Sequence, residues 1–140
     1  MQSPLFAPLI ALVLWSFVMW AWLYATRIPA MRKHKVVFDP HQPQSMFHAQ
    51  LAAEVRWKAD NYNNLMEQPT LFYAVVLTLA IIGEGNAVNV ALAWAYVGIR
   101  VVHSLVQAMI NVIIVRWALF MLGSVVLLVL TIRAAMVVFA

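Results

Sequence analysis

The chain has 140 residues, of which 65% are hydrophobic and only 10% are charged, whereas about a quarter of the residues of a soluble domain are charged. This composition indicates a membrane protein of one domain, and the absence of cysteine excludes disulfides, a thiolate nucleophile of its own and cysteine metal sites. The net charge of +4 is carried by bases beside apolar segments, so we expect contact with membrane lipids and no nucleic-acid partner.

The first apolar segment, residues 4–27, is predicted to be a retained transmembrane helix. It lacks a positively charged start, and its uncharged run exceeds the about 20 residues that a bilayer requires. In the polar segment that follows, Pro29, Pro40 and Pro43 are expected to prevent one continuous helix. Ser45 is the predicted N-cap of the next helix.

The second predicted span covers residues 46–83 and becomes apolar only from Pro69. Its uncharged part is about 24 Å long, slightly short for the hydrocarbon core, so the polar residues before it are expected to lie at membrane depth and to face protein. A turn at residues 83–86 leads to predicted spans over residues 86–112 and 116–139. The sequence thus predicts an all-α integral membrane protein, a four-transmembrane-helix bundle within one domain, residues 1–140.

The distribution of basic residues predicts the topology. The first loop and the start of the second span carry six bases, Arg116 lies in the third connection, and the second connection carries none. The positive-inside rule therefore places the first loop in the cytoplasm and both termini outside, in the periplasm if the membrane is a bacterial inner membrane.

Polar residues form a stripe on each of the two middle spans. On a wheel of 100° per residue, each stripe occupies about 100° of arc. The stripe of the second span contains Arg56, Asp60, Asn63, Asn64 and Glu67. The stripe of the third span contains Tyr96, Arg100, His103, Ser104, Gln107 and Asn111.

Because charged groups that face lipid are costly, the two stripes are expected to face each other or a shared cavity. They either join helices or form a functional site, and the nearby bases favour an anionic, water-borne ligand. Glu67 and Arg100 are expected to lie within ion-pair reach or to share a ligand or water. His34, His41 and His48 lack compact metal-ligand spacing and are interpreted as solvated loop residues.

Two segments carry motifs at a defined spacing. The segment RWKADNYNNLMEQPTLFYAVVL contains an Asn-x-x-Glu motif, Asn64 and Glu67, followed by proline and aromatics. The segment RVVHSLVQAMINVIIVR contains an Arg-x-x-His motif, Arg100 and His103, followed by Arg116. Together the two segments resemble the family of membrane-associated proteins in eicosanoid and glutathione metabolism (MAPEG), and bacterial members most closely.

The resemblance implies a homotrimer of four-helix bundles that holds glutathione between subunits as a cosubstrate. It implies that Arg116 is the catalytic residue that stabilises the glutathione thiolate. The glutathione-binding residues that we expect are Arg56, Asn64, Glu67, Arg100, His103 and Gln107. The implied activity is that of a membrane transferase or peroxidase acting on lipophilic electrophiles or hydroperoxides.

A second interpretation is a non-catalytic membrane subunit that trimerises or associates with a larger membrane complex. Hydroxyl groups that active members carry are replaced here by Gln107, Trp117 and Phe120, and an arginine that they often carry is replaced by Asn63. A third interpretation is a lipid or quinone binder that uses the same cleft.

Overall fold

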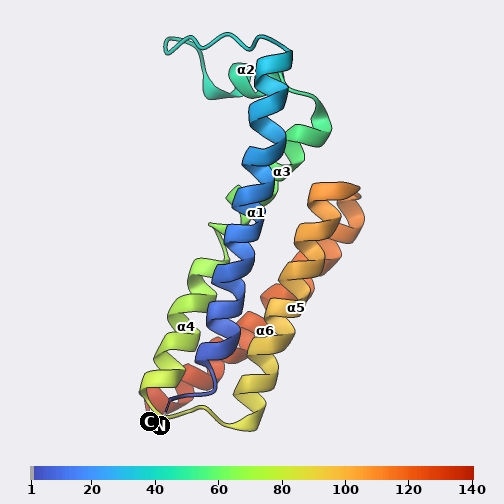
Figure 1. Cartoon of the computed structure of the whole chain (residues 1–140). Helices are drawn as coiled ribbons and strands as arrows, with labels where there is room; N and C mark the ends of the chain where they lie inside the picture. Colours follow the sequence, from blue (N-terminus) through green and yellow to red (C-terminus); the bar gives the residue numbers. More distant parts are fainter. Residues whose placement is uncertain (1) are drawn as a thin grey trace.

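The computed structural model describes residues 2–140. The helices are α1 (Phe6–Lys33), α2 (Gln44–Ala49), α3 (Ala53–Leu65), α4 (Pro69–Ile81), α5 (Ala87–Met109) and α6 (Ile113–Val138), shown in Figure 1. Four helical stretches are long and apolar enough to cross a membrane: α1, α3 together with α4, α5, and α6. The predicted all-α, four-span architecture is therefore confirmed.

The first helix continues past its expected end. α1 includes Pro29 and ends at Lys33 rather than near Arg27. Proline removes only one hydrogen bond of the helix, and Pro29 is exposed beyond the apolar run, where water can hydrate the carbonyl group left without a donor. The second and third prolines of this segment do lie outside helices.

The second span is broken twice, where one helix was expected. α2 is a separate short helix, and a turn over residues 66–68 separates α3 from α4, whose first residue is Pro69. Proline suits this first position because its missing N–H has no partner there. The predicted N-cap is wrong: α2 begins at Gln44, one residue before Ser45, and the side chain at its N-cap, Pro43, makes no capping bond.

The core lies where α1, α4, α5 and α6 meet. Phe72 of α4 stacks on Tyr96 of α5, with ring centroids 4.6 Å apart and an angle of 14° between the rings. Both side chains are fully buried, and Leu12 of α1 and Leu130 of α6 are buried in the same cluster. This cluster holds the four spans together and fixes the orientation of α5.

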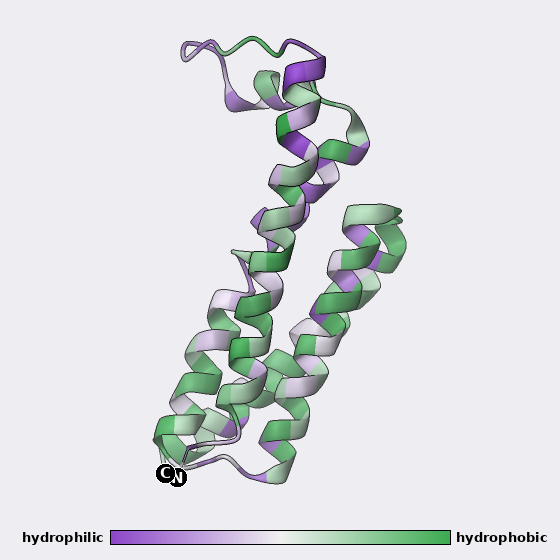
Figure 2. Cartoon of the chain, viewed as in Figure 1, coloured by the Kyte–Doolittle hydropathy of each residue, from purple (hydrophilic) through white to green (hydrophobic). Residues whose placement is uncertain are grey.

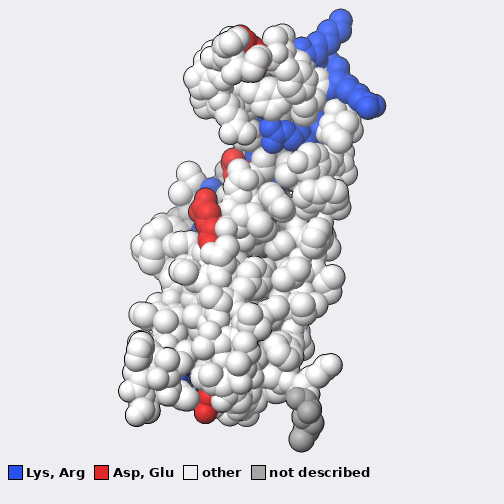
Figure 3. Space-filling model, turned by 90° about the vertical axis from the view of Figure 1, so that its left-hand side faces the viewer, with Lys and Arg blue, Asp and Glu red and all other residues white. Residues whose placement is uncertain are grey.

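The two ends of the bundle differ. The termini lie together at one end, where Arg133 of α6 donates to the side chain of Asn89 on α5. At the other end α1 and α3 extend beyond the α5–α6 turn and carry the loop and α2 (Figure 1). Figure 2 shows hydrophilic residues concentrated there, and Figure 3 shows that Lys and Arg gather at this end while the rest of that face carries a few charged groups, most of them acidic.

Candidate functional site

The polar stripe of α5 is buried within the chain. Arg100 is 1% exposed, and His103, Ser104 and Gln107 are buried with it. Tyr96, at the other end of the stripe, belongs to the apolar core. The predicted burial is confirmed for the part of the stripe that lies on α5, since the apolar outer face of α5 leaves these residues directed toward α3 and α6. Asn111, the last residue of the predicted stripe, lies beyond the end of α5 at Met109 and is half-buried.

Asn64 of α3 joins the two stripes. Arg100 Nη2 donates to the Asn64 side-chain oxygen at 2.9 Å and to its backbone oxygen at 3.1 Å. The Asn64 amide nitrogen donates in turn to Gln107 Oε1 at 3.4 Å. Asn64 therefore links two residues of α5 and is itself held in one orientation. The expected facing of the two stripes holds for Asn64, whereas Asp60, Asn63 and Glu67 of the α3 stripe are exposed and make no hydrogen bond to α5 within residues 2–140.

The expected pairing of Glu67 with Arg100 within one chain is wrong. Glu67 is exposed, and in the part of the chain that the structure describes, residues 2–140, the only salt bridge joins His48 and Asp60. The reason is local: α3 ends at Leu65, so Glu67 lies in the turn and no longer follows the helical period of Asn64. A ligand shared by Glu67 and Arg100 stays a prediction.

Arg56 lies about two turns before Asn64 on α3 and is half-buried. Within the described residues its Nε atom is buried and has no hydrogen-bond partner. It does not line the hollow beside Asn64, so the structure does not bring it to the other predicted binding residues.

A hollow of about 250 Å³ opens between α3, α5 and α6, and we call it the Arg116 hollow. It brings together three of the predicted site residues. Its lining consists of Asn64, His103, Ile113, Arg116, Trp117 and Phe120. The half-buried Arg116 lies in the first turn of α6, where the helix dipole adds positive potential.

The orientation of Arg116 is set by the turn before α6. Its Nη1 atom donates to the Asn111 side chain at 2.6 Å. Asn111 has a φ of 50°, a left-handed conformation that asparagine tolerates better than most residues. The Nε atom of Arg116 is buried and has no partner within residues 2–140.

A second polar link was not predicted. Tyr96 donates through its hydroxyl to Gln68 Oε1 at 3.1 Å, and Gln68 Nε2 donates to Ser124 Oγ at 2.7 Å. These bonds join the α3–α4 turn to α5 and α6. Gln68 directly precedes Pro69, and proline as a signal for a helix start was the available indication that Gln68 lies in a turn between two helices.

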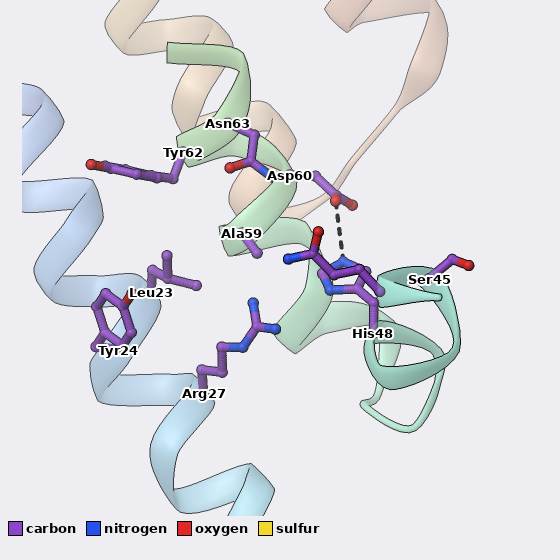
Figure 4. A pocket seen from close by; sticks show the side chains of 10 residues that line it. Leu23, Tyr24, Arg27, Ser45, His48, Ala59, Asp60, Tyr62 and Asn63 are labelled. Atoms are coloured by element: carbon purple, nitrogen blue, oxygen red, sulfur yellow. Dashed lines mark hydrogen bonds and ion pairs between the residues drawn. The ribbon is translucent and has the colours of Figure 1, made fainter. Parts of the chain in front are cut away.

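A second hollow, of about 370 Å³, lies between α1, α2 and α3, and sequence reasoning missed it. Figure 4 shows Arg27 of α1 pointing into it, with His48 of α2 and Asp60 of α3 on the opposite side. His48 Nε2 lies 3.3 Å from Asp60 Oδ1. Tyr24 and Asn63 also line it, so residue Asn63 of the predicted stripe faces this hollow.

Several buried polar atoms on α5 have no hydrogen-bond partner. Arg100 is almost wholly buried, yet its Nε and Nη1 atoms have no partner among the described residues, and Ser104 Oγ also lacks one. Buried polar groups are normally hydrogen-bonded to protein or to ordered water, so these atoms have unused hydrogen-bonding capacity. Arg100 and Ser104 do not line the Arg116 hollow, and an anionic ligand at these atoms stays a prediction.

Comparison with known proteins identifies one family. The model of the MAPEG family matches residues 5–136. No curated protein and no solved structure matches the chain. The match covers nearly the whole chain, so the chain belongs to the MAPEG family.

Proposed function

We propose, from the premise that the chain belongs to the MAPEG family, that it is a glutathione-dependent membrane transferase or peroxidase. Its substrates would be lipophilic electrophiles or hydroperoxides that arrive from the bilayer. The observation that carries this function is the Arg116 hollow, in which a cation at a helix start lies beside His103 and Asn64. Membership of the family supports glutathione-related chemistry in general.

The residues present fit glutathione. Its carboxylates require donors, and Arg116, whose Nε atom has no partner within residues 2–140, lines the hollow with the required charge. The free Nε and Nη1 atoms of Arg100 add positive charge close to Asn64 but lie outside the lining of the hollow. Glutathione supplies the thiol whose ionised form is the nucleophile. Asn64, held between Arg100 and Gln107, offers a fixed amide to the peptide.

Arg116 would carry the chemistry. A cation near sulfur favours the charged thiolate, and the start of α6 adds its positive dipole end to the same region. Trp117 and Phe120 form an apolar wall of the hollow. They would exclude water and receive the lipophilic part of the second substrate, because electrostatic stabilisation is stronger in a water-poor site.

A homotrimer would complete the site. Glu67 is exposed and does not pair with Arg100 of its own chain. In a trimer with glutathione at the subunit boundary, Glu67 and Arg56 would reach the ligand together with groups of a neighbouring copy. Such a contact across the subunit boundary would give a role to Glu67, the motif residue that does not pair with Arg100 of its own chain.

Thiolate absorbance near 240 nm, recorded while glutathione is added to the purified protein, tests this function. We expect a thiolate signal in the wild type, its loss in Arg116→Ala, and its retention in Lys33→Ala, which removes an exposed charge far along the chain. A thiolate signal that survives Arg116→Ala would remove the role of this arginine.

The alternative is a non-catalytic subunit of a larger membrane complex. Trp117 favours it, since this large side chain lines the hollow and is 58% exposed, available to a partner helix. Calorimetry that detects no glutathione binding to the wild type would select this alternative.

A further inference from the structure

The end of α1 places a lysine where the backbone favours glycine. Val36 N donates to Met31 O and Lys35 N donates to Arg32 O, the two bonds of a Schellman motif. This motif needs a left-handed residue, and Lys35 has a φ of 47°. A side chain in this conformation is strained, so a lysine here suggests a use for its charge.

The same chain uses unstrained residues at its two comparable positions. The Schellman motif after α4 has Gly83, with a φ of 82°, and the left-handed residue after α5 is Asn111. Glycine and asparagine are the residues that tolerate this region best. Among residues 2–140, Lys35 is therefore the one left-handed residue that is neither.

Lys35 lines a hollow of about 310 Å³ that we call the Lys35 hollow. Its lining combines an apolar wall with two cations: Ile28, Met31, Arg32, Lys35, Val36 and Phe38. Phe38 is 68% exposed and lies in contact with Phe47, with ring centroids 5.1 Å apart. The loop thus offers uncovered apolar surface directly beside the cations.

The residues of this hollow follow directly on the uncharged run of α1, so we expect them near the lipid headgroups of a bilayer that α1 spans. The uncharged run of α1 ends at Thr26, and Arg32 is about 9 Å farther along the axis at 1.5 Å per residue. The headgroup layer is roughly 5 to 8 Å deep on each side of a bilayer. On this count Ile28, about 3 Å past Thr26, lies within the headgroup layer, and Arg32 lies at its outer edge. Because helical side chains lean toward the N-terminus of their helix, the Arg32 side chain is directed back toward the phosphates.

The local charge is almost entirely positive. Arg27, Arg32, Lys33 and Lys35 fall within one short stretch, and Figure 3 shows basic side chains projecting from this end. The acid of the loop, Asp39, accepts a bond from the His41 backbone N–H at 2.9 Å and does not line the Lys35 hollow.

We propose that the Lys35 hollow binds an anionic phospholipid, with Arg32 and Lys35 at the phosphate and with Ile28, Met31 and Phe38 against the glycerol and upper acyl chain. A free phosphate would use only the cations, and a zwitterionic lipid would bring its own positive charge to them. The combination of an apolar wall and two cations selects a lipid with net negative charge.

Native mass spectrometry of the purified protein in detergent, titrated with phosphatidylglycerol or phosphatidylcholine, tests this site. We expect a phosphatidylglycerol adduct that is stronger than the phosphatidylcholine adduct. Lys35→Gly and Arg32→Gln should each weaken it about fivefold. Lys33→Gln is the matched control, because it removes an exposed charge that does not line the hollow, and it should change the adduct much less.

Lys35→Gly also separates binding from folding. Glycine suits the left-handed position, so the thermal stability of this variant should equal or exceed that of the wild type while lipid binding falls. Phe38→Ser should weaken the adduct without a change of charge. Equal losses in Lys33→Gln and Lys35→Gly would show diffuse attraction and overturn the site. No preference for phosphatidylglycerol, or displacement of the lipid by equal concentrations of glycerol 3-phosphate, would also overturn it.

Discussion

The side chain of Asn64 is the acceptor that orients the buried guanidinium of Arg100, and its removal should destabilise the bundle. Asn64→Ala deletes the 2.9 Å bond to Arg100 Nη2, while the backbone bond at 3.1 Å remains. A hydrogen bond to a charged group contributes about 1.5–3 kcal/mol, and neutral bonds between membrane helices average about 0.6 kcal/mol. Since the bond to Gln107 is long, at 3.4 Å, we expect a loss of about 2 kcal/mol in the free energy of unfolding.

Reversible unfolding by dodecyl sulfate in mixed micelles, followed by circular dichroism, measures this loss. Asn63→Ala is the matched control, because Asn63 is the neighbouring residue of the same type on the same helix, is exposed, and makes no side-chain hydrogen bond within residues 2–140. It should change the unfolding free energy by less than about 0.5 kcal/mol. Equal effects of the two substitutions would refute the assignment of Asn64 as the structural partner of Arg100.

Three further stability predictions use the same unfolding assay. Gly85→Ala should destabilise the protein, because a Cβ atom there would lie 2.9 Å from Pro4 Cδ, whereas Gly98→Ala meets nothing within 4 Å and should be neutral or stabilising by up to about 1 kcal/mol. Phe72→Ala should cost about 3–5 kcal/mol through loss of its stack on Tyr96, and a loss below about 1 kcal/mol would contradict its place in the core. Ser45→Ala should leave stability unchanged within about 0.5 kcal/mol, because Ser45 caps no helix; a larger loss would restore it as the N-cap.

Periodicity predicted the parts of the site that lie on unbroken helices. Arg100, His103 and Gln107 share one face of α5 because that helix continues without interruption from Ala87 to Met109, as the wheel assumes. Asn64 also lies within a regular helix, and its contact with Arg100 follows from the cost of leaving a charge in lipid. The contact between α3 and α5 at Asn64 and Arg100 could thus be predicted from the sequence.

The failures come from breaks in the helices. The helical wheel assumed that α3 continues as one regular helix through Glu67, although Pro69, two residues later, indicates the start of a new helix. The hollow lined by Arg27, His48 and Asp60 unites three separate helices, and no spacing along the chain encodes such a meeting. The hydrogen bond from Gln68 to Ser124 was also missed, because it joins two segments that are far apart in the sequence.

The burial of Arg100 has a consequence for biosynthesis. An arginine at the centre of a lone helix costs about 3 kcal/mol on insertion scales, so α5 is poorly suited to leave the translocon by itself. α6 is the most apolar of the four spans and is joined to α5 by the short connection over residues 110–112. α3, made earlier, already presents the Asn64 oxygen that Arg100 needs. The C-terminal half is therefore expected to partition into lipid as a helical hairpin, after α6 has emerged from the ribosome and against a first half that is already in place.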